Sequence, residues 1–162
     1  MNDTTMLTNI RHLLAEQGIS FKEIEHPPTY TSEESAAARG EELGVGAKAL
    51  LLKTDDVFRL FVLPADLKLD SAAIKRELNV KKIRFATSDE LREMTGLVPG
   101  SVPPFGHPLL PFELFAEEAM GTRCDLVAFN AGSLTNSIIM SARDWEAIAR
   151  PHRFFFGQAE VT

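Results

Sequence analysis

The sequence contains a single cysteine, Cys124, and no apolar run long enough to cross a bilayer. One cysteine excludes an intramolecular disulfide framework and a zinc site built from several thiolates. A membrane-spanning helix needs about 20 consecutive apolar residues, whereas the longest run, 47–52, is short and contains a lysine. The N-terminal residues lack the basic segment and apolar block of a signal peptide. We therefore expect a cytoplasmic protein without a membrane partner.

Positive charge is not in excess either, because the formal net charge at pH 7 is −6. Apolar residues make up 44% and charged residues 25% of the 162 residues, which is typical of a globular protein. A chain of this length is expected to fold around one core, so we predict a single domain over residues 1–162. DNA is not an expected partner, and contact with RNA would require a local basic patch.

Several common catalytic signatures are missing. The chain has no Gly-x-Ser-x-Gly elbow, no phosphate-binding P-loop and no His-Glu-x-x-His helix. Its four histidines show no metal-ligand spacing, so neither a metal nor a cofactor is predicted. Residues 44–49 match the dinucleotide pattern G-x-G-x-x-A, but here a helix precedes the pattern and a strand follows it, the reverse of what that site needs. Cys124 has no identifiable base and is interpreted as a packing residue.

Periodicity, capping residues and turn residues predict an α+β protein. The predicted helices are at 4–17, 31–39, 70–78, 87–96 and 141–150. The sequence also predicts about seven strands, at 21–24, 47–53, 57–63, 81–86, 113–115, 125–130 and 134–140, with 153–156 as a candidate final strand. These elements do not alternate regularly, which favours a mixed, mostly antiparallel sheet.

Three segments stand out as candidate functional elements, although each also has a purely structural interpretation. Lys48 interrupts the apolar strand 47–53 and is predicted to share a face with Leu50 and Leu52; a lysine that snorkels from a strand edge gives the same pattern. Residues 96–111 form a loop rich in proline and glycine, which could equally be a rigid connector. Residues 129–133, Phe-Asn-Ala-Gly-Ser, are also typical of a tight turn between strands.

Taken together and in this order, the three segments resemble the YbaK and prolyl-tRNA-synthetase-associated editing domains. The resemblance covers roughly residues 20–150, and its most specific part is Gly100-x-x-x-Pro104 followed by Phe105-Gly106, downstream of Lys48. The turn 26–29, His-Pro-Pro-Thr, also resembles the N-terminal region of that family. The resemblance implies a partly barrel-like sheet surrounded by helices. It also implies a hydrolase, an aminoacyl-tRNA deacylase that removes wrongly attached amino acids and so protects translation fidelity.

The resemblance further implies the residues of the site. Lys48 is the catalytic residue, at the mouth of the pocket, where it holds the tRNA acceptor end. The substrate-binding residues are Thr29, Gly100, Ser101, Val102, Pro103, Pro104, Phe105, Gly106, Asn130, Ala131, Gly132 and Ser133. Some relatives carry histidine where this chain has Asn130, a departure that bears on amino-acid specificity. Because an aminoacyl ester is already activated, a positioned water and backbone N–H groups around the oxyanion suffice for hydrolysis.

The expected partners are the acceptor end of mischarged tRNA and an aminoacyl-tRNA synthetase. Residues 66–84 carry six basic residues against three acidic ones, a surface that suits phosphates or is simply a solvated face. Seryl, threonyl, alanyl and cysteinyl esters all stay open as substrates; the polar turn at 130–133 favours small hydroxylated groups, and proline is expected to be poor. Two alternatives are a non-catalytic module that binds tRNA or a synthetase, and a small-molecule hydrolase or binder with the same pocket.

Overall fold

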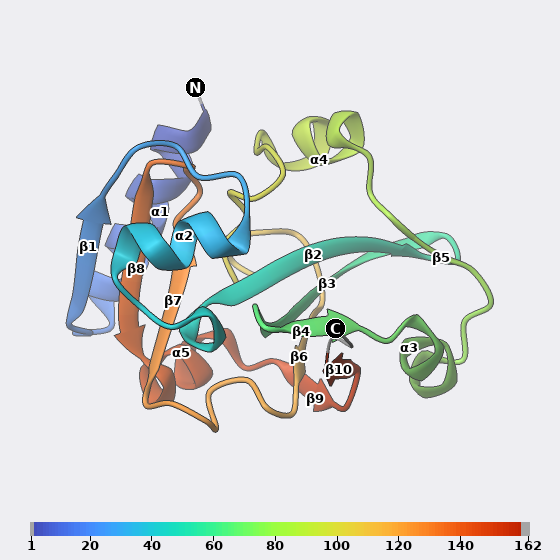
Figure 1. The fold of residues 1–162 in the computed structure, drawn as a ribbon. Helices are drawn as coiled ribbons and strands as arrows, with labels where there is room; N and C mark the ends of the chain where they lie inside the picture. The colour runs from blue at the N-terminus through green and yellow to red at the C-terminus, as the bar shows by residue number, and fades with distance from the viewer. Residues whose placement is uncertain (1, 160–162) are drawn as a thin grey trace.

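The computed structural model describes residues 2–159 (Figure 1). These residues contain five α-helices, and their ten strands form three sheets. The helices are α1 (Asn2–Glu16), α2 (Ser32–Arg39), α3 (Ser71–Leu78), α4 (Ser88–Thr95) and α5 (Ala142–Ala149), with a 3-10 turn, η1 (Leu43–Val45). The strands are β1 (Phe21–Glu25), β2 (Ala47–Thr54), β3 (Val57–Pro64), β4 (Leu67–Leu69), β5 (Ile83–Phe85), β6 (Leu114–Glu117), β7 (Leu126–Asn130), β8 (Asn136–Ser141), β9 (His152–Phe154) and β10 (Gly157–Ala159). Within these residues no helix has both the length and the apolar composition needed to cross a bilayer.

The predicted α+β class with a mixed, mostly antiparallel sheet is confirmed. The sheets have the strand orders β1-β8-β7, β10-β4 and β5-β2-β3-β6-β9, and among the described strands only the pairs β3–β6 and β6–β9 are parallel. An isolated parallel bridge between Gly46 and Ala128 joins the five-stranded sheet to the three-stranded one, so the sheets curve around a shared core. The strands β4 and β10 lie outside the predicted set, because three residues are too few to show alternation.

The hairpin formed by β2 and β3 has an apolar cluster on each face. Leu51 belongs to the larger cluster, which also contains residues of α1, α5, β7 and β8, whereas Leu52 belongs to a smaller cluster with Phe61 and Phe156. Since side chains alternate along a strand, Lys48 lies on the same face as Leu50 and Leu52, as the sequence predicted.

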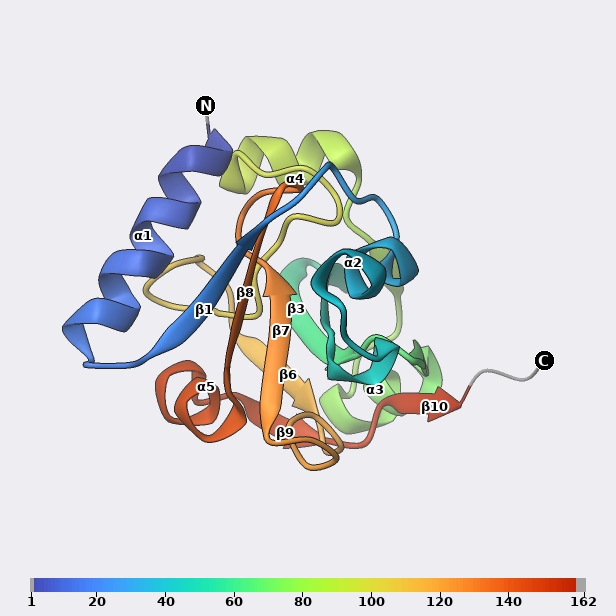
Figure 2. The same ribbon diagram turned by 60° about the vertical axis from the view of Figure 1, so that its left-hand side comes forward.

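Local capping fixes the helix that borders the site. Thr31 caps α2: its side chain accepts the N–H of Glu34, whose carboxylate in turn accepts the N–H of Thr31, which completes the predicted capping box. Gly40 ends this helix with a left-handed backbone at φ 71°. In Figures 1 and 2, α2 and α1 lie on opposite sides of the sheet β1-β8-β7, and α2 covers β7 near the start of β2.

The loop between α4 and β6 has neither helix nor strand, yet it packs into the larger cluster. Leu97, Phe105 and Leu110 are all buried there. The ring of Phe105 meets that of Phe129 on β7 edge to face, with centroids 5.5 Å apart. The indole N–H of Trp145 on α5 donates to the carbonyl of Pro104 over 2.8 Å. The loop is therefore held against both the sheet and α5.

Candidate active site

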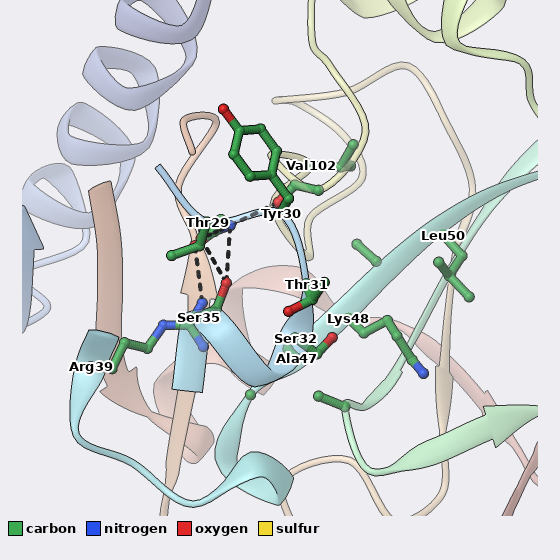
Figure 3. A pocket seen from close by; sticks show the side chains of 15 residues that line it. Thr29, Tyr30, Thr31, Ser32, Ser35, Arg39, Ala47, Lys48, Leu50 and Val102 are labelled. Carbon is green, nitrogen blue, oxygen red and sulfur yellow. Dashed lines mark hydrogen bonds between the residues drawn. The ribbon is translucent and has the colours of Figure 1, made fainter. Parts of the chain in front are cut away.

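A cavity of about 180 Å³ lies between α2, the start of β2, the loop at Gly100 and the end of β7 (Figure 3). Its volume is below the range of roughly 300–1,000 Å³ that holds drug-sized ligands, so it suits a small chemical group. The lining consists of Thr29, Tyr30, Thr31, Ser32, Ser35, Arg39, Gly46, Ala47, Lys48, Ala49, Leu50, Ala65, Gly100, Val102 and Asn130. Five of the residues predicted from the sequence are among them: Thr29, Lys48, Gly100, Val102 and Asn130.

Two hydroxyl groups and one amide form the buried polar wall of the cavity. The oxygens of Thr29 and Ser35 lie 2.8 Å apart and share a hydrogen bond. The amide nitrogen of Asn130 donates to the carbonyl of Gly100 over 2.9 Å, with longer contacts to both hydroxyls. Asn130 therefore connects the end of β7 to the Gly100 loop and to α2. Since a hydroxyl can both donate and accept, this wall can pair with a polar group on a bound ligand.

Arg39 supports this wall from the last turn of α2. Its Nε donates to the hydroxyl of Ser137 over 2.9 Å, and its terminal nitrogen donates to Oδ1 of Asn130 over 3.2 Å. The Ser137 hydroxyl also contacts Nε2 of His26 at 2.8 Å. Burial lowers the pKa of Arg39 to about 10, and the attraction of Glu41 opposes that shift only in part. Arg39 is still a cation at neutral pH and fixes the orientation of Asn130.

Lys48 lies across the cavity from this network, on β2. Its ammonium donates to the carbonyl of Leu67 on β4 over 2.6 Å, and it also attracts the carboxylate of Asp66. In Figure 3 the side chain points away from Thr29 and Arg39, toward the side of Leu50. The ammonium therefore lies at the rim of the cavity rather than in its polar wall.

The other predicted site residues do not line the cavity but build the frame around it. The N–H of Gly132 donates to the carbonyl of Ser101 over 2.9 Å, which joins the turn after β7 to the loop. The hydroxyl of Ser133 contacts Thr135 and Asn136 instead of the cavity. The remaining members of this set, which also lie outside the cavity lining, are Pro103, Pro104, Phe105, Gly106 and Ala131. Gly106 lies against Phe112 and Leu114 rather than at the junction between the turn and the loop.

Two residues of the loop that line the cavity, Gly100 and Val102, have backbone N–H groups that are not used within the fold described. Within residues 2–159, the N–H groups of Gly100 and Val102 have no hydrogen-bond partner, whereas that of Ser101 donates to the carbonyl of Val98. Gly100 has a φ of 89°, a left-handed conformation that favours glycine. In the same part of the chain, no group of three or more His, Cys, Asp or Glu side chains is placed to hold a metal ion. The residues that line the cavity supply hydrogen-bonding groups and the charges of Lys48 and Arg39.

Comparison with known proteins assigns the class. The sequence model of the aminoacyl-tRNA editing domain matches residues 26–148, and the chain therefore belongs to that family of editing domains. It is 35% identical over 144 residues to the "Multifunctional Ser/Thr-tRNA deacylase ProXp-y" of Escherichia coli K12, with 86% of this chain and 85% of that protein covered. It is 29% identical over 156 residues to the "Prolyl-tRNA editing protein ProX" of Acetoanaerobium sticklandii, with 91% and 93% covered.

A solved structure agrees with this assignment. A crystal structure of a candidate trans-editing enzyme for prolyl-tRNA synthetase superposes with a TM-score of 0.80 and 25% identity, over 95% of this chain and 98% of that one. The activity expected from the sequence, hydrolytic editing of mischarged aminoacyl-tRNA by a deacylase, is confirmed, and tRNA is therefore a partner. The expected YbaK-like fold is confirmed as well.

Sequence reasoning missed the α2 side of the cavity. Ser35 and Arg39 are four residues apart, so they lie on one face of the helix, together with the buried Ala36. An arginine in the last turn of a helix is common because its charge complements the helix dipole. The position of Arg39 in the sequence therefore did not indicate that its side chain is buried beside the cavity. The four-residue spacing of Ser35 and Arg39 places them on one helix face, but the sequence alone does not show which face is buried.

Proposed function

We propose that this chain hydrolyses the ester of mischarged seryl- and threonyl-tRNA, releasing the free amino acid and intact tRNA. The observation that carries the proposal is the hydroxyl and amide wall formed by Thr29, Ser35 and Asn130 inside a small cavity. A wall of this kind can pair with a side-chain hydroxyl of the substrate, while the cavity volume favours small groups. The name of the Escherichia coli relative, a Ser/Thr-tRNA deacylase, supports the same proposal.

The proposed mechanism uses a water molecule as the nucleophile. Water attacks the ester carbonyl carbon, the bond to the ribose oxygen breaks, and that oxygen takes up a proton and becomes the 3′-terminal hydroxyl of the tRNA. The N–H groups of Gly100 and Val102 are the candidate donors to the oxyanion, since both residues line the cavity and both groups lack another partner in residues 2–159. Lys48 holds a phosphate or ribose oxygen of the acceptor end at the rim.

The predicted residues outside the cavity have a positioning role in this proposal. The hydrogen bond from Gly132 to Ser101 and the one from Trp145 to Pro104 hold the loop in place, so its donors need no reorganisation when the ester binds. Local contacts support the same loop and turn: the N–H of Phe105 donates to the carbonyl of Pro103, and that of Ala131 donates to the carbonyl of Asn136. Gly106 allows the loop to lie against Phe112 and Leu114. We further propose that residues 1–162 form one domain, because the larger cluster joins α1, α4 and α5 to strands of both larger sheets. A single cooperative unfolding transition by two probes is the expected result.

A panel of five aminoacyl-tRNAs tests the proposal. Seryl- and threonyl-tRNA should lose their ester about tenfold faster than alanyl- or cysteinyl-tRNA, because an unmade buried hydrogen bond costs about 1–3 kcal/mol. Prolyl-tRNA should be the slowest, since its amine belongs to a rigid ring. Preference for prolyl-tRNA, or equal rates on all five, would contradict the proposed specificity. Binding of tRNA without any loss of ester would favour the non-catalytic alternative.

Two substitutions test whether the polar wall of the cavity causes the preference for hydroxylated aminoacyl groups. Thr29→Val and Ser35→Ala each remove one hydroxyl and keep most of the side-chain volume, so both should reduce the preference for seryl- over alanyl-tRNA several-fold. Ser133→Ala is the matched control, because its hydroxyl contacts Thr135 and Asn136 rather than the cavity. A synthetase is also proposed as a partner, in line with the solved structure of a candidate trans-editing enzyme. Co-elution with prolyl-tRNA synthetase checks that partner.

A further inference from the structure

A second hollow, of about 440 Å³, adjoins the cavity on β2. The two hollows share Lys48 and Leu50, so one opens toward the other past the lysine. The second hollow continues along β2 to Leu52, is bounded by Lys68 on β4, and ends at Phe85 on the edge strand β5. In Figure 1 β5 lies at the end of β2 that is far from α2. The hollow is therefore a groove that leads away from the cavity.

The sheet register explains why the groove has an apolar floor and an exposed aromatic end. Leu52 is paired with Phe85, and directly opposed residues of antiparallel strands have side chains on the same face. Leu52 is fully buried, whereas the Phe85 side chain is 58% exposed. An exposed phenylalanine at the end of a hydrophobic floor is a ready surface for a planar ligand.

The charges along the groove are positive. Lys48 and Lys68 are on its walls, and none of its lining residues is acidic. Arg84 is also present, but its guanidinium is held by both carboxylate oxygens of Glu90 and contributes less. A ligand that suits this groove carries negative charge along its length and a flat apolar group at its far end. Single-stranded nucleic acid has both features.

We propose that this groove holds the unpaired 3′ end of the tRNA, with Lys68 at a backbone phosphate and Phe85 stacked on a base. The inference rests on the proposed function, because an ester held in the first cavity requires the preceding nucleotides to leave it past the rim at Lys48. The distance along β2 from Lys48 to Leu52 is about 13 Å at ~3.3 Å per residue. That length equals three to four stacked nucleotides at ~3.4 Å each, about the length of the unpaired end.

Binding of uncharged tRNA, followed by fluorescence anisotropy at several salt concentrations, tests the groove independently of hydrolysis. Phe85→Ala should weaken binding about tenfold without changing the salt dependence, because stacking is uncharged. Lys68→Ala should reduce the slope of log K against log salt concentration by about 0.7, the value for one phosphate of a single strand. The matched controls are Phe155→Ala, a phenylalanine that is 75% exposed outside the groove, and Lys75→Ala on α3, and both should bind like the wild type.

Deacylation separates this inference from the proposed function. On seryl-tRNA, Phe85→Ala and Lys68→Ala should raise KM, whereas on seryl-adenosine, which lacks the preceding nucleotides, both should match the wild type. A wild-type protein that hydrolyses neither substrate would refute the proposed function. The anisotropy measurement would then still show whether Lys68 and Phe85 of the groove bind tRNA. Variants that match their controls in tRNA affinity and in KM would overturn the groove. Unchanged tRNA affinity with lost binding to prolyl-tRNA synthetase would overturn it in favour of a protein-docking surface.

Discussion

Replacing Arg39 with methionine tests whether the buried cation serves the site more than the stability of the fold. Methionine keeps the apolar stem and removes the guanidinium, so the hydrogen bonds to Ser137 and Asn130 are lost. Each such bond to a charged donor contributes about 1.5–3 kcal/mol, or about 3–6 kcal/mol together. The Ser137 hydroxyl still has His26 as a partner, which limits the damage.

The burial of the charge offsets part of this loss. Burial lowers the pKa of Arg39 from its usual value to about 10, and each pKa unit corresponds to about 1.4 kcal/mol. Since the side chain is partly exposed and its charge is screened by solvent, the free-energy penalty for burying the charge is about 2–3 kcal/mol. Arg39→Met should therefore lower the free energy of unfolding by only about 1–3 kcal/mol. Deacylation of seryl-tRNA should fall further, on the order of a hundredfold, because Asn130 loses its charged donor and keeps only the Ser137 hydroxyl, at 3.1 Å, as a donor to its Oδ1 among the described residues.

Urea denaturation and single-turnover deacylation at pH 7 measure the two effects. Arg92→Met is the control, since Arg92 is exposed on α4 and its ion pair with Asp89 is exposed too, and we expect the substitution to change neither quantity appreciably. Arg39→Lys keeps the charge but not the planar fork, so it should restore stability more than activity. A loss of more than about 4 kcal/mol in the free energy of unfolding, or wild-type turnover in Arg39→Met, would refute the reasoning.

Three further predictions concern the rim, the frame and a helix cap. Lys48→Ala should keep the fold, as judged by circular dichroism, and lower deacylation about a hundredfold, whereas wild-type turnover would remove Lys48 from the mechanism. Gly132→Ala should lower the free energy of unfolding in urea by about 2–5 kcal/mol, because the new Cβ would lie 2.6 Å from the Cβ of Met6 and φ is +73°. In the control Gly18→Ala, φ is +68° but the space around the new Cβ is open, so the loss should be only about 1 kcal/mol. Equal losses in the two variants would contradict the steric argument. Hydrogen bonds from Arg84 and Thr87 lower the pKa of Glu90 to about 2, so the stability that its carboxylate adds is complete above the usual pKa of 4.5 and is lost as the pH falls toward 2. The difference in Tm between the wild type and Glu90→Gln should therefore vanish between pH 4.5 and pH 2. A difference that stays constant over this range would refute the prediction.

Local signals predicted the parts of the fold that depend on near neighbours in the sequence. The boxes opened by Thr31 and Thr87 set the starts of α2 and α4, because the atoms involved are only three residues apart. The pairing of β4 with β10 could not be predicted in this way. It joins Leu67–Leu69 to Gly157–Ala159, and no local rule links segments so distant in the chain.

The same division applies to the candidate site. Lys48 and Gly100, which the family resemblance predicted as site residues, both line the cavity. The local patterns, a lysine within an apolar strand and a glycine within a proline-rich loop, drew attention to their segments. The partners of Asn130 were not found, because Ser35 and Arg39 reach it only after α2 packs across β7. Ordinary residues acquired their role from tertiary packing, which a single sequence does not display.

The turn at Asp55 decides on which side of the sheet the cation of the site emerges. Asp55 has a left-handed φ of 54°, and its carboxylate accepts the N–H groups of Lys81 and Lys82. A slip of one residue in the β2–β3 pairing would rotate Lys48 into the larger apolar cluster and Leu51 out to the rim. An aspartate about 23 Å along the strand from Lys48 thus helps to fix the register that keeps a positive charge at the mouth of the cavity.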